Sequence, residues 1–286
     1  MFVAFDECRQ LLAAKPILLG SASPIGELHI DTPVKRQTAA PPRTKDQRSF
    51  ARAREVARAI VAERHDRPSL VSNIACEVAA EIIEGQRSPG DDLNSVELSR
   101  RFRTSRTPIR EALMLLEKEG LVQILPRRRP RVALLAMEEV REIYQARAAL
   151  FDLIATAVAR NASIDDIGTL RAPLSEMERA FRDHDLNTFV WANVDFYDRN
   201  TQLANNRTVK RILDSLLLRT LRLRRLSLSQ PDRMQASLDD NARLLKAYEN
   251  RDATLAAALI SSNHMNALAA LEKCLHSEEA RLTPRT

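Results

Sequence analysis

The chain has 286 residues, enough for one or two independent cores, and its composition, with six Gly and 4% aromatic residues, is typical of a helix-rich protein. No apolar run reaches the roughly 18 residues that a membrane span needs, which argues against a membrane protein. The three cysteines are far apart and odd in number, so they favour a reducing cytoplasm over a disulfide framework or a zinc cluster.

The charge is unevenly distributed along the chain. The net charge is +6, and residues 100–131 carry ten Lys or Arg against three Glu, whereas residues 136–286 are neutral. A compact basic stripe beside a neutral C-terminal half indicates a local contact with a polyanion. A solvated helix face with basic neighbours gives the same counts, so charge alone leaves both interpretations open.

Residues 1–68 are predicted to be a largely disordered N-terminal extension. Five prolines are scattered among polar residues before position 48, without a sustained hydrophobic period. A short helix fits residues 49–64, where Phe50, Val56 and Ile60 lie loosely along one face. We expect the extension to be either a disordered arm or the product of a start codon placed too early.

Residues 69–135 are predicted to form a winged helix-turn-helix domain. Apolar residues at helical spacing mark three helices, and capping residues begin the second and the third of them. A Ser-Pro-Gly turn separates the first helix from the second, and Gly120 ends the third. Two strands, over residues 121–125 and 131–135, follow with a basic turn between them. Three helices and a small hairpin are the layout of a winged helix.

Residues 136–278 are predicted to form an all-helical domain, with a tail at 279–286. Six segments rich in Leu and Ala at helical spacing are separated by short breaks. Short connections between helices of this length imply an antiparallel bundle. The expected fold is therefore mainly α, with a winged helix-turn-helix domain followed by an all-helical antiparallel bundle.

Two runs in the first of these domains carry a family resemblance. They are SRTPIREAL at 105–113 and LEKEGLV at 116–122, and they follow the Ser-Pro-Gly turn in register. The stretch 82–132 resembles the DNA-binding domain of the GntR family of bacterial regulators, above all its FadR-like branch. The resemblance implies a cytoplasmic transcription regulator that binds a double-stranded DNA operator as a homodimer.

The third helix and the wing are expected to contact DNA. Arg106 and Arg110 are four positions apart, so both project from one face of the helix that enters the major groove. A guanidinium that binds guanine O6 and N7 contributes roughly 1–3 kcal/mol of discrimination. Ser105 and Thr107 suit phosphate hydrogen bonds. Three arginines of the wing are expected to read bases in the minor groove or to bind phosphates: Arg127, Arg128 and Arg129. The family usually has a glycine where this chain has Arg129, so the turn is expected to differ there.

The C-terminal half carries family features as well. The helix at 138–159, the pair Phe196-Tyr197 and the stretch from Asn241 to His264 resemble the FCD domain. This domain is the all-helical effector domain of the FadR-like branch, found in regulators of carbon-acid metabolism. The resemblance implies that residues 136–278 bind a small-molecule effector and join two chains.

Family members commonly hold a divalent metal in this bundle with one Asp and three His. The four corresponding positions hold Asn193, Tyr197, Asn241 and His264. Such a set offers no anionic ligand at neutral pH. The resemblance therefore implies a degenerate metal site, in which only His264 is retained, and no metal cofactor. A shifted register would bring in the carboxylate of Asp195 or Asp198, but the match at Phe196 argues against it.

The same four positions are expected to line a polar effector pocket, with Arg147 as the cationic anchor of a carboxylate. A surface or interdomain salt bridge is the alternative for Arg147. The resemblance thus implies a transcription regulator, taken here as a repressor, whose operator affinity is changed by a small organic acid. A second hypothesis is a DNA-binding regulator without small-molecule input, controlled by its abundance or by a protein partner. A helical enzyme is disfavoured, because no catalytic triad order, phosphate loop or pair of catalytic carboxylates is supported.

Overall fold

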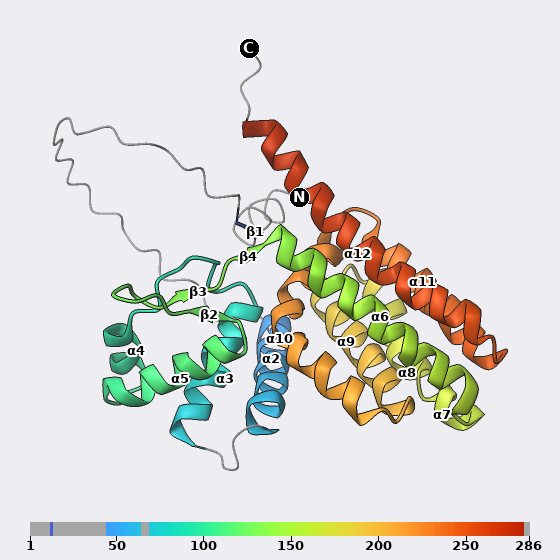
Figure 1. Cartoon of the computed structure of the whole chain (residues 1–286), viewed down its shortest axis with the longest axis horizontal. Coiled ribbons are helices and arrows are strands. Elements are labelled where there is room, and N and C mark those ends of the chain that lie inside the picture. Colours follow the sequence, from blue (N-terminus) through green and yellow to red (C-terminus); the bar gives the residue numbers. More distant parts are fainter. Residues whose placement is uncertain (1–11, 14–43, 64–68, 283–286) are drawn as a thin grey trace.

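The computed structural model describes residues 12–13, 44–63 and 69–282 of the chain. In this part the protein is almost entirely helical, and its elements form two bodies with one helix between them (Figure 1). The smaller body, which we call the head, consists of α3 (Leu70–Ile83), α4 (Ser95–Arg101), α5 (Arg106–Lys118), β2 (Val122–Gln123) and β3 (Arg131–Val132). The larger body, which we call the bundle, consists of α6 (Met137–Asn161), α7 (Ile164–Gly168), α8 (Arg171–Arg182), α9 (Leu186–Leu203), α10 (Arg207–Ser229), α11 (Arg233–Glu249) and α12 (Ala253–Leu282). The helix between the two bodies is α2 (Thr44–Glu63).

The head contains the three helices and the short hairpin that the sequence predicts. The side chains of Ser69 and Asn94 cap α3 and α4 by accepting hydrogen bonds from backbone amides of the first turn. β2 and β3 pair antiparallel, and each is two residues long, shorter than predicted. Another short strand, β4 (Leu135–Ala136), pairs in parallel with β1 (Leu12–Ala13).

The bundle has seven helices among the described residues, against six predicted segments. The predicted segment 164–183 is divided between α7 and α8 at Thr169. Pro173 lies in the first turn of α8, where a missing N–H is tolerated, whereas in a continuous helix its ring would clash with the Thr169 carbonyl. α6 and α12 run antiparallel along most of their length (Figure 1). The bundle is held together by a large apolar cluster that includes the buried rings of Phe189 and Tyr248.

Residues 44–63 form a helix, although most of the stretch 1–68 was expected to be disordered. α2 is longer at its start than the predicted helix and packs on α3, α9 and α10. Its buried stripe is narrow and consists of Ala53, Ala57, Ile60 and Val61. Because two of these four residues are alanines, the stripe is a weak apolar signal in the sequence. The four residues become part of a core only where α2 packs on its neighbouring helices. The rest of the predicted extension, β1 apart, lies outside the described residues.

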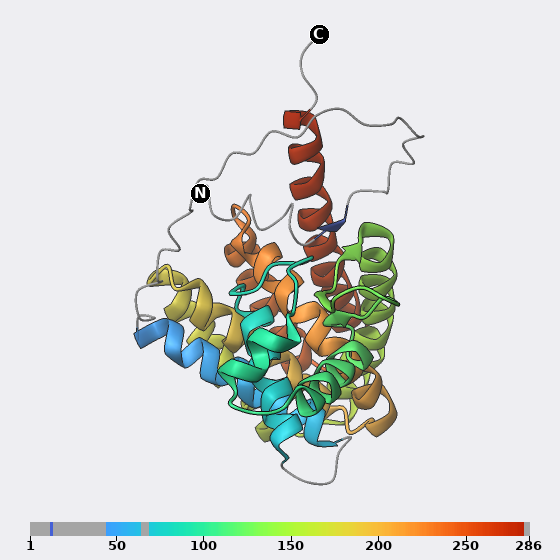
Figure 2. The ribbon, with the colours of Figure 1, turned by 90° about the vertical axis from the view of Figure 1, so that its left-hand side faces the viewer.

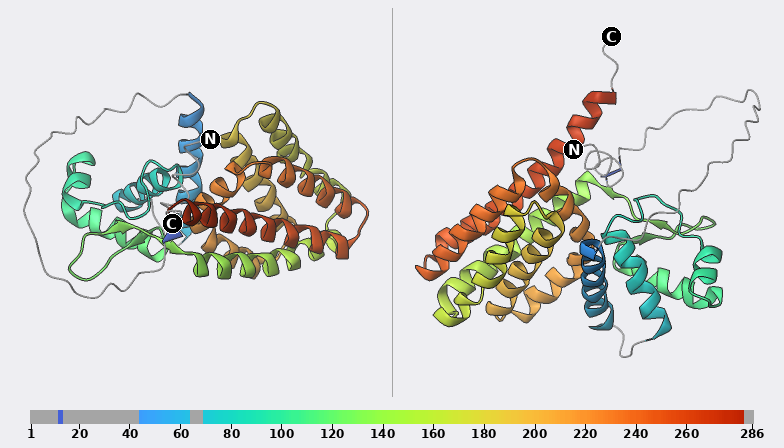
Figure 3. Two further views of the ribbon diagram at one scale, coloured as in Figure 1. Left: turned by 90° about the horizontal axis from the view of Figure 1, so that it is seen from above. Right: turned by 180° about the vertical axis from the view of Figure 1, so that it is seen from behind.

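The hydrophobic core of the head continues through α2 into the bundle. One cluster contains apolar residues of α3 and α5, the stripe of α2, and four residues of the bundle. These four are Trp191 and Val194 of α9 and Leu218 and Leu221 of α10. Figures 2 and 3 show α2 lying against both the head and the bundle. The head is therefore docked on the bundle and not only tethered to it.

Two further expectations concern membranes and cysteines. None of the described helices is both long and apolar enough to cross a membrane. Cys76 in α3 is a buried free thiol, whereas Cys274 near the end of α12 is disulfide-bonded. The number and spacing of the cysteines had not indicated this bond.

Candidate DNA-reading face and ligand cavity

Helix α5 of the head presents a polar face to solvent. Its opposite face is fixed in the core by Ile109, Leu113 and Leu116, which are at most 1% exposed. Arg106 and Arg110 are exposed on the other side, and neither is ion-paired with another described residue. Two arginines presented in this way, one helical turn apart, suit a recognition helix that reads base edges in the major groove.

The N-terminus of α5 is suited to a phosphate. Ser105 occupies the N-cap position but makes no side-chain hydrogen bond to the helix, and both Ser105 and Thr107 are exposed. The amides of a first helical turn have no partner inside the helix, and the helix dipole adds positive potential there. Both hydroxyls therefore lie where the sequence places phosphate contacts.

The wing presents its arginines unequally. Arg127 and Arg128 are exposed and have no ion pair within the described part of the chain. Asp92 attracts Arg129 at 3.7 Å and Arg131 at 2.8 Å. The residue with left-handed backbone is Arg127, at φ 58°, and not Arg129, where the missing family glycine was expected to change the turn. The wing therefore offers Arg127 and Arg128 to DNA more freely than Arg129.

A buried carboxylate supports the reading face from behind. Glu81 of α3, 3% exposed, binds Arg87 at 2.5 Å and also Arg101 of α4. The hydrogen bond with Glu81 is the largest cause of the raised pKa of Arg101. These contacts fix α4 against α3, just before the turn that leads into α5. Nothing in the sequence distinguishes Glu81 from exposed glutamates, so its role was not predicted.

The bundle encloses a small cavity between α6, α9, α10, α11 and α12. It offers about 40 Å³ to the centres of water-sized molecules, which admits a few waters or a compact polar group. Its polar lining residues are Tyr144, Arg147, Asn193, Tyr197, Thr220, Arg224, Ser227, Arg233, Ser237, Asn263 and His264. Four of the five predicted effector residues thus meet at one place. The fifth, Asn241, does not line this cavity: its Nδ2 lies 3.9 Å from Met177 Sδ.

Three arginines give the cavity its charge. Burial and, second, the nearby Arg224 lower the pKa of Arg147 to about 10. Burial also lowers the pKa of Arg224 and of Arg233. Arg224 donates a hydrogen bond to Asn193 Oδ1 and lies 5.0 Å above the centre of the Tyr197 ring. Arg147 has no salt bridge with another described residue, so a role in a surface or interdomain salt bridge, the alternative considered above, gains no support.

His264 is held as a neutral ring. It stacks on Phe151 at 4.6 Å between ring centres and meets the edge of Tyr197 at 5.2 Å. Its Nδ1 donates to the Ile260 carbonyl, 2.8 Å away. Burial, and then the charge of Arg147, lower the pKa of His264 well below its usual value.

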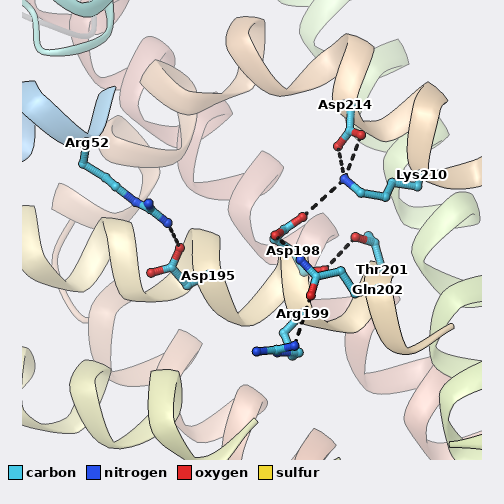
Figure 4. Close-up of polar contacts among 8 residues, drawn as sticks. All are labelled: Arg52, Asp195, Asp198, Arg199, Thr201, Gln202, Lys210 and Asp214. Atoms are coloured by element: carbon cyan, nitrogen blue, oxygen red, sulfur yellow. Dashed lines mark hydrogen bonds and ion pairs between the residues drawn. The ribbon is translucent and has the colours of Figure 1, made fainter. Parts of the chain in front are cut away.

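These residues do not fit a divalent metal ion. The cavity combines one imidazole with three guanidiniums, which repel a cation. In the described part of the chain, no group of three or more His, Cys, Asp or Glu is placed to hold a metal ion. The carboxylates that a shifted register would supply are engaged elsewhere (Figure 4): Asp195 accepts from Arg52 of α2, and Asp198 lies 3.4 Å from Lys210 Nζ.

Arg224 and Arg233 are cavity residues that the sequence analysis did not single out. Four arginines lie between positions 219 and 225 of α10, so each resembles a surface residue. One signal was present: Arg224 falls on the same helical stripe as the apolar residues Leu217, Leu221 and Leu228. An arginine on an apolar stripe has to be buried or functional.

Comparisons with known proteins match both bodies. Residues 70–132 match the family described as bacterial regulatory proteins, gntR family, and residues 142–267 match the FCD domain. The chain is 29% identical over 188 residues to the uncharacterized HTH-type transcriptional regulator YdhC of Bacillus subtilis (strain 168), covering 64% of this chain and 83% of that one. It is 28% identical over 208 residues to the gluconate operon transcriptional repressor of Bacillus licheniformis, covering 70% and 83%.

The solved structure of E. coli McbR/YncC has the same fold, with a TM-score of 0.60 at 20% identity, over 72% of this chain and 99% of that one. The first family match falls on the head and the second on the bundle, while α2 lies outside both. The curated relatives are transcription regulators and not enzymes. The chain is therefore a DNA-binding transcription regulator that belongs to the GntR family and has a C-terminal FCD domain.

Proposed function

We propose that this regulator is a repressor whose affinity for its operator changes when a small organic acid occupies the bundle cavity. The observation that carries the proposal is the lining of the cavity, which contains Arg147, Arg224 and Arg233 but no Asp or Glu. Guanidinium groups bind carboxylates through two parallel hydrogen bonds. The relative from Bacillus licheniformis is named as a repressor of the gluconate operon, and gluconate is a carboxylate.

The proposed operator complex is a homodimer on a pseudo-palindrome in the cytoplasm, without a metal cofactor. Two recognition helices related by a two-fold axis require two half-sites at a fixed spacing. Light scattering coupled to size-exclusion chromatography tests the assembly, because a dimer has twice the 32.3 kDa mass of one chain. A single-chain mass at micromolar concentration contradicts it.

Two substitutions test DNA reading by α5. We expect Arg106→Ala and Arg110→Ala each to weaken operator binding by about 5- to 150-fold, corresponding to about 1–3 kcal/mol, because each removes a base contact. Binding to unrelated DNA should change little. Fluorescence anisotropy measures both affinities, with an operator first selected from random DNA and Arg182→Ala, an exposed arginine of α8, as control. An equal loss on both DNAs would reassign the two residues to phosphate contacts.

The effector role is tested on the same complex. Purified protein on its operator is titrated with a panel of small organic acids, and release of DNA is followed by anisotropy. We expect at least one acid to release the operator and to raise the melting temperature of the free protein. A regulator without small-molecule input predicts that no compound does either. Arg147→Gln should abolish the response and leave operator binding intact.

A further inference from the structure

The charges of the cavity are only partly balanced by the protein. Arg147 contacts the face of Phe151, 5.3 Å from the ring centre, and Arg224 is held by an amide and a phenol ring. Asp240 is the carboxylate that acts on Arg233, and it lies outside the lining. Three positive charges therefore face one another with one carboxylate nearby.

A neighbouring cavity does not supply the missing negative charge. It shares Arg147 and Arg224 with the first cavity and reaches Asp198 and Asp214. Lys210 contacts both of these carboxylates, at 3.4 Å and 2.8 Å (Figure 4), and its single charge offsets one of them. Neither carboxylate is among the charges that shift the pKa of Arg147 or Arg224. The lining of the first cavity therefore keeps an excess of about two positive charges.

The unsatisfied polar atoms point to the kind of ligand. Arg233 Nε and Asn263 Nδ2 are buried and have no hydrogen-bond partner among the described residues, although both residues line the cavity and are at most 9% exposed. Both atoms are donors only. The Tyr144 and Tyr197 hydroxyls add further donors, and burial keeps both phenols protonated by raising their pKa, that of Tyr197 to about 12. A lining rich in donors and positive charge selects a ligand that accepts on every side.

We infer that the cavity binds a compact group with two negative charges, a phosphate or a dicarboxylate, held by Arg147, Arg224 and Arg233 without a metal ion. The inference rests on the proposed function in taking this cavity as the effector site. A dianion neutralises the excess charge, whereas a monocarboxylate leaves one buried guanidinium unpaired. Its oxygens also satisfy the free donors of Arg233 and Asn263.

Calorimetric titration of the EDTA-treated protein at pH 7.5 and constant ionic strength tests the inference. The probes are inorganic phosphate, malonate and acetate. We expect phosphate or malonate to bind at least tenfold more tightly than acetate, and added zinc to leave both affinities unchanged. The tighter-binding dianion shows whether the ligand carries a phosphate or two carboxylates. Equal binding of acetate, binding that requires zinc, or no binding of either dianion overturns the inference.

Variants link the binding to the three arginines. Arg224→Gln and Arg233→Gln should each weaken dianion binding at least tenfold, and Arg233→Lys, which keeps the charge, should weaken it less. Arg160→Gln, at an exposed position near the end of α6, is the matched control and should bind like the wild type. If Arg224→Gln does not fold, the two Arg233 variants carry the test. Unchanged binding in both of them contradicts the inference.

Operator binding, measured separately, distinguishes the two proposals. A dianion that binds the cavity but leaves the operator complex intact supports the ligand class and contradicts the effector role. If a monocarboxylate releases the operator and the protein does not bind dianions, the effector role is supported and the ligand class is contradicted.

Discussion

The Arg147 guanidinium destabilises the folded protein as long as no anion is bound. It is 3% exposed, and burial lowers its pKa from the usual value of an arginine to about 10. Between these two values the unfolded chain binds more protons than the folded one, so stability rises with pH across that window. Below that window the guanidinium is charged in both states, and the full free-energy cost of burying the charge opposes folding. This cost amounts to about 3 kcal/mol of unfolding free energy.

Replacing this charge should therefore stabilise the ligand-free protein. We expect Arg147→Met to raise the free energy of unfolding by about 1–3 kcal/mol, since an apolar side chain of similar length removes the buried charge. Urea unfolding in a buffer without phosphate or carboxylate measures the change. Arg160→Met is the control and should stay within about 0.5 kcal/mol of the wild type. A loss of stability in Arg147→Met would show that the guanidinium has a structural partner.

His264 predicts a loss of stability on mild acidification. Its pKa in the folded state lies well below 6.5, so below that pH the unfolded chain takes up a proton that the folded chain does not. The free energy of unfolding must therefore decrease as the pH is lowered, by at most about 1.4 kcal/mol per pH unit for this residue. Urea unfolding at pH 7.5 and 5.5 should show a larger drop for the wild type than for His264→Gln. Equal drops contradict the prediction.

Cavity residues were predictable where they stand at the positions that hold the metal ligands in other family members. Asn193, Tyr197 and His264 stand at such positions, and the structure brings them together. Arg224 and Arg233 were missed because many exposed arginines occur in this chain, and only the rotation of each helix in the packed bundle decides which one turns inward. Asn241 stands at a family position too, but it lies outside this cavity.

Among the elements, α10 contacts both the cavity and the head. Arg224 lines the cavity, and the next residue, Arg225, binds Glu84 at the end of α3 at 2.6 Å. Ser49 of α2 joins this network by donating to Glu84 Oε1 at 3.0 Å. Arg222, on the same helix, donates to the Arg87 carbonyl at 3.1 Å. A ligand that moves Arg224 therefore acts on the helix that holds the head, which is a direct physical route for coupling.

Breaking the salt bridge between Arg225 and Glu84 should uncouple ligand binding from DNA release. We expect Arg225→Gln to lower the free energy of unfolding by about 3 kcal/mol, because it leaves the buried Glu84 carboxylate unpaired. The ratio of operator dissociation constants with and without ligand should also fall. The double variant Arg225→Gln, Glu84→Gln should recover most of the stability but not the ratio. A ratio equal to that of the wild type contradicts the coupling role of α10.

Elements with strong apolar spacing were predictable, and the others depend on tertiary contacts. The helices of the head and bundle follow from their apolar spacing. The strands of the wing were predicted too long, because their ends make no regular ladder. α2 was underestimated, since Ala53 and Ala57 become core residues only against the helices that they meet.

At the scale of the molecule, head, α2 and bundle share one apolar cluster. We expect them to unfold as one unit, because separating the head would expose this cluster and leave the Arg225–Glu84 pair in water. Differential scanning calorimetry should show a single transition whose van 't Hoff and calorimetric enthalpies agree. Two resolved transitions would show that the head melts independently of the bundle.

The shared cluster also gives the protein a built-in optical reporter. Trp191 is the one tryptophan of the chain, and its indole Nε1 donates to Ser49 Oγ at 2.8 Å, where α2 meets α9. Indole emission depends on the polarity around the ring, so any shift of α2 or of the head that admits water to this contact moves the emission to longer wavelengths. A movement that couples the proposed ligand to the operator would thus be followed by intrinsic fluorescence in the unmodified protein, during a single titration and without an attached dye.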